Sequence, residues 1–244
     1  MVFSQVSMTQ AKTFDAFTTN YEQRTMSMSN APLGAILEHV ANGTEMFVRV
    51  ARLAFYWKNK FEEMHPQENL NDLIAGHINS VSGQLRADLV ACRNGLTTRE
   101  ELVRRYGHLR PGQFSVFGES YADDPNTYLF AQIKQAEVIW SEKQTHAFES
   151  AIEFKNIITF MQARERMKFL FSQSLHLFAT KLRDQLRKQG ISKDEAAGMS
   201  WKTLNACLHG SHRFGTPRSR SSHHLITLFK NCPPGSFYFS YLAL

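Results

Sequence analysis

From about Thr127 to Lys188 the chain contains neither proline nor glycine. These are the two residue types that most often end a helix, so their absence over such a length favours continuous helix. The second half of the run also has apolar residues three or four positions apart, in a single seam: Met167, Phe171, Leu175, Phe178, Leu182 and Leu186. This spacing is the period of an α-helix, and the run predicts one or two very long helices.

Helical spacing also covers the first half of the chain. Apolar residues predict a long amphipathic helix that starts after Pro32 and ends at His65-Pro66, with an interruption near Gly43 left open. Two further helices are predicted over residues 11–24 and 68–92.

Capping signals mark several of the predicted helix ends. Thr98 and Ser192 are each followed three residues later by glutamate, the pattern of a capping box at a helix start. Gly95 and Gly190 stand where glycine commonly ends a helix. The fold class predicted from these patterns is all-α, a bundle of long helices joined by short irregular loops.

Composition divides the chain into three parts. Residues 1–30 form a polar lead-in segment, residues 31–208 a helical domain, and residues 209–244 a loop-rich tail that ends in an apolar segment. The tail contains no Asp or Glu and carries four of the six net positive charges, on Arg213, Arg218, Arg220 and Lys230. The rest of the chain is nearly neutral, so we expect no nucleic-acid partner.

The cysteines indicate a reducing compartment. Cys92, Cys207 and Cys232 are odd in number and contain no C-x-x-C spacing, which argues against a disulfide framework or a zinc site. No signal peptide and no apolar run long enough for a membrane span is found. We expect a cytoplasmic protein without a membrane partner.

Common self-contained catalytic motifs are absent from the sequence. It contains no G-x-x-x-x-G-K-[ST], no G-x-G-x-x-G and no G-x-S-x-G. His209, His212, His223 and His224 have no carboxylate among them, so we expect no metal site.

Residues Tyr106 to Gly112, of sequence Y-G-H-L-R-P-G, form the most chemically distinctive loop. Glycine and proline specify its backbone, and His108 and Arg110 are suited to binding an anion. A loop held together by its own hydrogen bonds is the other interpretation, and the sequence leaves both open.

A second polar group lies within the Pro- and Gly-free run. Arg164 and Lys168 are four residues apart and share one helix face, where Glu165 can pair with both. This pattern is typical of a solvated helix face, and it also fits a site for an anion or a partner protein.

Three stretches resemble the phosphoenolpyruvate-utilising enzymes, the family of phosphoenolpyruvate synthase, pyruvate phosphate dikinase and rifampicin phosphotransferase. They are similar to the family's L-A-R-x-A-F helix, its F-L-x-x-Y-G-H-L-R-P-G segment and its A-R-E-x-x-K-F-x-F-S helix. In this chain they are residues 50–55, residues 102–112, followed by Y-A-D-D-P at 121–125, and residues 163–172, followed by G-I-S-K-D-E at 190–195. Their order and spacing agree with the family over about residues 33–205.

The resemblance places the chain in the helical region between the family's ATP-grasp domain and its swivelling phosphohistidine domain. It implies an ATP-dependent phosphotransferase segment that is inactive alone, with no catalytic residue of its own. Complete family enzymes use ATP and magnesium, whereas this chain by itself is expected to bind no cofactor. The implied partners are the two missing domains, in cis or in trans, and a small-molecule phosphoryl acceptor.

The residues implied to contact substrate or a neighbouring domain are Tyr106, His108, Arg110, Arg164, Glu165 and Lys168. Relatives often carry aspartate where this chain has Ser115, so a carboxylate that could be a ligand, a cap or an ion-pair partner of Arg110 is missing. The alternative function is a non-catalytic helical scaffold or docking subunit derived from the same family.

Overall fold

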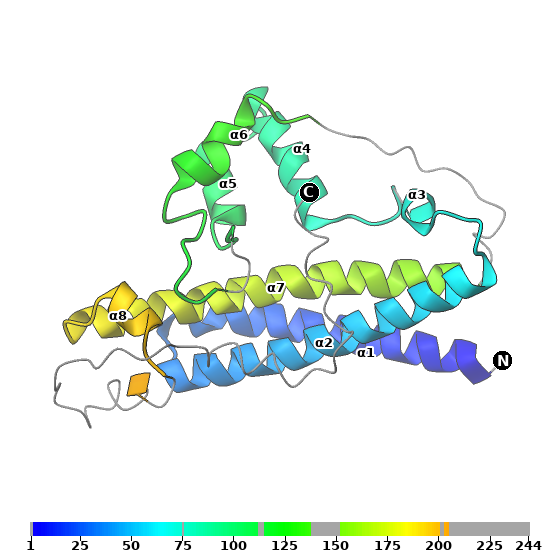
Figure 1. Ribbon diagram of the computed structural model, residues 1–244, viewed down its shortest axis with the longest axis horizontal. Coiled ribbons are helices and arrows are strands. Elements are labelled where there is room, and N and C mark those ends of the chain that lie inside the picture. The colour runs from blue at the N-terminus through cyan, green and yellow to red at the C-terminus, as the bar shows by residue number, and fades with distance from the viewer. Residues whose placement is uncertain (1, 75, 112–114, 138–151, 201–202, 205–244) are drawn as a thin grey trace. The chain divides into compact units, whose positions relative to one another are not determined.

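The computed structural model describes residues 2–74, 76–111, 115–137, 152–200 and 203–204, without the side chains of residues 2–11, 71 and 72. Every regular element in these residues is helical, which confirms the all-α prediction (Figure 1). None of the described helices is both long and apolar enough to cross a lipid bilayer. The helices are α1 (Val2–Ser27), η1 (Met28–Asn30), α2 (Leu33–Met64), α3 (Leu70–Ile74), α4 (Val81–Arg93), α5 (Arg99–Tyr106), the π-helical turn η2 (Asn126–Phe130), α6 (Ala131–Ile133), α7 (Ile152–Lys188) and α8 (Lys193–Ala197).

Residue contacts divide the chain into two compact units, 1–178 and 179–244. The boundary falls within α7, between Phe178 and Ala179. The first unit contains α1 to α6 and most of α7. The boundaries at residues 30 and 208 that composition suggests stay a prediction.

Three long helices form the main core of the first unit, and Figure 1 shows α1, α2 and α7 running alongside one another. Phe14 of α1 packs edge-on against Phe160 of α7, with ring centroids 6.0 Å apart. Pairs of rings also join α2 to α7 in reversed order: Phe47 with Phe171 at 6.2 Å and Phe61 with Phe154 at 6.2 Å. Tyr21 of α1, further along that helix, hydrogen-bonds to Ser174 of α7. Thus α1 and α7 run parallel, and α2 is antiparallel to α7.

A second core lies among α4, α5, η2 and α6. It consists of Leu85, Leu89, Leu102, Tyr106, Leu129, Ile133 and Ala136. Phe169 of α7 packs against this cluster, while other residues of α7 belong to the main core. Therefore α7 contacts both cores, which explains why it carries apolar residues on more than one face.

The predicted helix after Pro32 is confirmed as α2, with Pro32 at its N-cap and His65 at its C-cap. It continues without a break through Gly43. A Cβ atom at that position would lie 2.1 Å from the Tyr21 Oη atom, so glycine is needed there because Tyr21 of α1 crosses α2 in close contact. The helix predicted over residues 11–24 is present but longer, since α1 spans Val2–Ser27.

The prediction of a single helix over residues 68–92 is wrong. The chain forms α3 and α4 instead, and between them Gly76 has a φ of 78°, which a continuing helix cannot contain. Ser80 then starts α4 by accepting a hydrogen bond from the Gly83 N–H at 3.1 Å. A local cap and a left-handed glycine thus override an apolar pattern that continues through the break.

The two described parts of the long Pro- and Gly-free run both contain helix, but of very different length. Its first part is only the turn η2 and the short helix α6, and residues 138–151 lie outside the described residues. Its second part is α7, which spans 37 residues. All six residues of the predicted seam are buried: Met167, Phe171, Leu175, Phe178, Leu182 and Leu186.

The predicted capping residues stand at helix ends. Thr98 accepts a hydrogen bond from the Glu101 N–H at 3.1 Å and starts α5, and Ser192 forms a complete capping box at the start of α8. Gly95 and Gly190 each have a φ of 73° at the places where helices were predicted to end. The tail at 209–244, with its histidines, lies outside the described residues.

Candidate functional site

One stripe of α7 faces the loops and short helices of the first unit. The Asn79 N–H donates to the Gln162 side chain at 3.1 Å, and Arg110 approaches His176 with 3.4 Å between Nη2 and Nδ1. Midway between these two α7 residues, Phe169 packs edge-on against the His108 ring. Successive members of the stripe are seven residues apart, a spacing that returns to nearly the same helix face. The stripe brings the loop after α5 against the helix segment that carries Arg164, Glu165 and Lys168.

Arg110 is buried and holds its own loop closed. Its Nη1 donates hydrogen bonds to the carbonyl oxygens of Gly118 and Val116, the latter at 3.5 Å. Charged hydrogen bonds to backbone carbonyls stabilise a loop conformation more than neutral ones do. The contacts of Arg110 therefore fit the interpretation of a loop held by its own hydrogen bonds.

Backbone contacts close the same loop at its base. The Tyr121 N–H donates to the Leu109 carbonyl at 2.8 Å, and the Ala122 N–H donates to the Gly107 carbonyl at 2.9 Å. A Cβ atom at Gly107 would lie 3.0 Å from the Ala122 Cβ, so glycine permits this close approach.

Ser115 caps the turn inside this loop. Its hydroxyl accepts a hydrogen bond from the Gly118 N–H at 2.9 Å, next to the carbonyl that Arg110 binds. The serine thus supplies a cap, which is one of the three roles considered for the missing carboxylate.

His108 is buried with its ring edge-to-face against Phe169, at 4.6 Å between centroids and an interplanar angle of 83°. Burial lowers the pKa of His108 to about 3, with smaller contributions from the nearby His176 and Arg110. The ring is therefore neutral at pH 7 and adds no positive charge to the site. Its Nε2 atom is buried and has no hydrogen-bond partner among the described residues.

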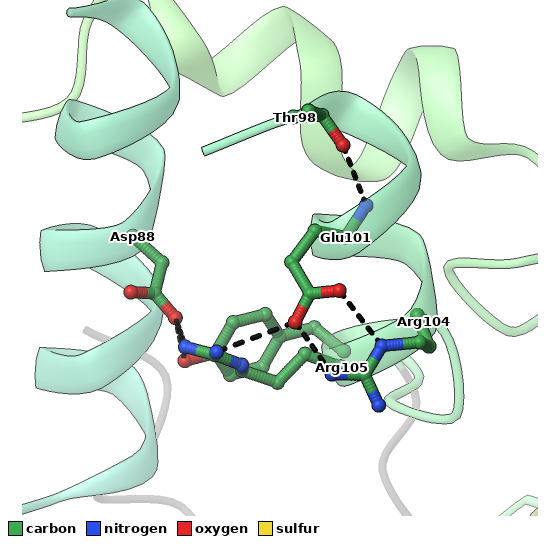
Figure 2. Close-up of polar contacts among 6 residues, drawn as sticks. Asp88, Thr98, Glu101, Arg104 and Arg105 are labelled. Carbon is green, nitrogen blue, oxygen red and sulfur yellow. Dashed lines mark hydrogen bonds and ion pairs between the residues drawn. The ribbon is translucent and has the colours of Figure 1, made fainter. Parts of the chain in front are cut away.

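Tyr106 and Asp88 connect α5 to α4. The Tyr106 hydroxyl donates to Asp88 Oδ2 at 2.7 Å, and Arg105 donates to the same oxygen at 2.5 Å. Figure 2 shows how Asp88 meets Arg105, which also contacts Glu101 on the same helix. Burial, followed by the hydrogen bond to Asp88, raises the pKa of Tyr106 well above its ordinary value. Tyr106 therefore remains a protonated donor within the fold.

Arg164, Glu165 and Lys168 form a net cationic group on a part of α7 where their side chains are partly or largely buried. Arg164 Nη1 lies 3.2 Å from Glu165 Oε1, and these side chains are only 12% and 10% exposed. The Arg164 guanidinium also lies 5.5 Å from the centre of the Phe55 ring on α2. Burial lowers the pKa of Lys168, while the neighbouring Glu165 opposes this shift and Arg164 adds to it. Arg164 thus pairs with Glu165, whose charge also acts on Lys168, and a segment with two cations and one carboxylate can attract an oxyanion.

All six residues singled out from the sequence lie in the first unit. Tyr106, His108 and Arg110 contact residues of α7, and Arg164, Glu165 and Lys168 lie on α7 itself. Sequence reasoning missed His176 and Asp88. His176 stands eleven residues after Glu165, on nearly the same helix face, so helical periodicity could have identified it. Asp88 had no comparable signal, because its partners lie on another helix.

The described residues contain no group of three or more His, Cys, Asp or Glu side chains placed to hold a metal ion. Comparison with known proteins found no matching family model, no matching curated protein and no matching solved structure.

Proposed function

We propose that the chain is a helical segment of a phosphoenolpyruvate-synthase-like, ATP-dependent phosphotransferase of the cytoplasm. Phosphoryl transfer would pass through a phosphohistidine on a separate swivelling domain, and ATP and magnesium would bind a separate ATP-grasp domain. In this proposal Arg164 and Lys168 face substrate or a neighbouring domain, and Glu165 orients the two cations.

The observation that carries the proposal is the convergence of three motif stretches on α7. Phe55, from the first stretch, lies against the Arg164 guanidinium of the third. His108, from the second stretch, packs on Phe169, also of the third. Residues of all three stretches, which are widely separated in sequence, thus meet at α7.

The chemistry of the Arg164 cluster is compatible with such a role. Enzymes that transfer phosphoryl groups act mainly by positioning and by stabilising negative charge. A partly buried arginine paired with Glu165, together with the nearby partly buried Lys168, carries more positive than negative charge in a place where water screens it weakly. A phosphate oxygen or an acidic side chain of a partner domain would meet both cations.

A scaffold without catalytic function is the second candidate, and the contacts of Arg110 and Tyr106 favour it. The Arg110 guanidinium binds carbonyl groups of its own loop, and the Tyr106 hydroxyl binds Asp88. On this interpretation the Y-G-H-L-R segment maintains the fold, and the chain only holds other domains in place.

Reconstitution distinguishes the two candidates. The purified chain would be mixed with separately produced ATP-grasp and phosphohistidine domains of a phosphoenolpyruvate synthase, and binding and phosphohistidine formation would be measured. The phosphotransferase proposal predicts complex formation that raises phosphorylation, with an Arg164→Gln/Lys168→Gln variant at least tenfold weaker in both. Arg86→Gln/Lys193→Gln, which removes two exposed charges elsewhere, serves as the matched control.

Two results would contradict the proposal. Binding without any gain in phosphorylation would support the scaffold. ATP hydrolysis or histidine phosphorylation by the chain alone would show that the catalytic parts are not confined to other domains.

A further inference from the structure

A groove of about 270 Å³ lies between α1 and α2, apart from the α7 stripe. Most of the residues that line it are polar or aromatic, and they include Phe17, Asn20, Tyr21, Arg24, His39 and Asn42. The proposed function uses none of these residues.

One wall of the groove is a stack of three rings. Phe17 stacks on Tyr21 with centroids 5.6 Å apart, and Tyr21 stacks on His39 at 3.9 Å. The Tyr21 hydroxyl is fixed from behind by a 2.6 Å hydrogen bond to Ser174 of α7. The wall is therefore held in place before any ligand arrives, which lowers the entropic cost of binding.

His39 presents a defined hydrogen-bond acceptor. The Thr25 hydroxyl donates its single proton to the Tyr21 carbonyl at 2.8 Å, so it must accept from His39 Nε2, also at 2.8 Å. Burial, then the charge of Arg24, lowers the pKa of His39 to about 4, and the ring is neutral at pH 7. Its Nδ1 atom is consequently an unprotonated acceptor, with no hydrogen-bond partner among the described residues.

The charge of the groove is positive on the α1 side. Arg24 is exposed and has no carboxylate partner among the described residues, whereas Arg49 on α2 is paired with Glu45 at 2.5 Å. The amides of Asn20 and Asn42 add neutral donors and acceptors. Arg24 is thus the cation available to a ligand, and His39 Nδ1 is the acceptor.

We propose that this groove binds a small oxyanion that also carries a hydroxyl group, such as a hydroxylated phosphate or carboxylate. The oxyanion pairs with Arg24, and the hydroxyl donates to His39 Nδ1. A groove of about 270 Å³ suits a compact metabolite.

Calorimetric titration of the full chain tests the site with four probes: glycerol 3-phosphate, glycerate, inorganic phosphate and glycerol. Glycerol 3-phosphate or glycerate should bind at least tenfold more tightly than the last two, since only they combine both groups. Comparing these two probes shows whether phosphate or carboxylate is preferred. Arg24→Gln should weaken binding at least tenfold, and Arg86→Gln, on α4, should leave it unchanged.

Nitrogen NMR of the imidazole rings measures the protonation of each ring nitrogen of His39 directly. In the free chain its signals should show a proton on Nε2 and none on Nδ1, and the bound ligand should shift the Nδ1 signal. The proposal is overturned if neither hydroxylated anion binds at millimolar concentration, if Arg24→Gln binds as tightly as the wild type, or if the Nδ1 signal does not move. Equal affinity for inorganic phosphate and glycerol 3-phosphate would likewise overturn the role of His39.

Discussion

The hydroxyl oxygens of Tyr21 and Ser174 lie 2.6 Å apart in a buried hydrogen bond between α1 and α7. The Ser174 hydroxyl already donates to the Phe171 carbonyl at 2.9 Å, so Tyr21 is the donor and Ser174 the acceptor. Burial raises the pKa of Tyr21 to about 12, so the phenol keeps its proton through the neutral range.

Replacing Tyr21 with phenylalanine should reduce the free energy of unfolding by about 0.5–1.5 kcal/mol, the net value of one such bond. The double variant Tyr21→Phe/Ser174→Ala should lose less than the sum of its parts, because the two residues interact directly. Urea unfolding measures both quantities. Tyr56→Phe, at a tyrosine that is 52% exposed on α2, is the control and should have little effect. Full additivity in the double variant would mean that the bond contributes nothing.

Gly43 and Gly34 lie on the same helix but should respond oppositely to alanine. At Gly43 the new Cβ would lie 2.1 Å from Tyr21 Oη and 2.5 Å from Cζ, so Gly43→Ala should destabilise the fold by about 1–3 kcal/mol. At Gly34 no atom beyond the neighbouring backbone of α2 lies within 4 Å of that Cβ position, and Gly34→Ala should be neutral or stabilise by up to about 1 kcal/mol. Thermal unfolding followed by circular dichroism compares them. Equal midpoints would show that α1 does not approach α2 this closely.

Arg110→Ala should lower stability by about 1.5–3 kcal/mol, because Val116 and Gly118 lose a charged hydrogen-bond donor. Phosphate and ATP binding by the chain should not change. Differential scanning calorimetry and isothermal titration calorimetry measure the two effects. Loss of phosphate binding with an unaltered unfolding temperature would instead assign Arg110 to a ligand site.

Acid should weaken the fold through two buried histidines. Burial sets the pKa of His39 at about 4 and that of His108 at about 3, both below the ordinary value of about 6.5. The unfolded chain therefore binds more protons than the folded chain below about pH 6.5, so the contribution of the two histidines to stability is complete above that pH and falls as the pH drops below it. The loss due to His39 levels off near pH 4 and that due to His108 near pH 3, where the folded form also becomes protonated.

The free energy of unfolding is measured across pH for the wild type and for each histidine variant. The difference between the two gives the pH-dependent contribution of the replaced histidine. The variants His39→Gln and His108→Gln should each be less sensitive to pH between about 6.5 and 3.5, as measured by urea unfolding midpoints. A variant profile that runs parallel to the wild-type profile would show that the histidine it replaces is solvated and titrates normally.

The long helices were predictable because their signals are local. Pro32 and His65-Pro66 bound α2, and the seam from Met167 to Leu186 identifies the buried face of α7. The break at Gly76 was missed because apolar residues continue through it at helical spacing, and a lone glycine in a helix costs only about 1 kcal/mol.

The candidate site was only partly predictable. Arg164, Glu165 and Lys168 are neighbours on one helix, so their proximity follows from spacing alone. The contact of Arg110 with its own loop, and the stack of Tyr21 on His39, depend on how the chain folds back on itself. Patterns within a single helix contain no information about either.

The parallel pairing of α1 with α7 has a consequence during synthesis. Roughly 90 residues separate the end of α2 from the start of α7, and ribosomes add about 5–20 residues per second. The nascent α1–α2 hairpin must wait for about 5–20 s with Phe14, Phe47 and Phe61 uncovered by their α7 partners. A newly made chain thus leaves this aromatic surface uncovered until translation reaches the helix that completes the bundle.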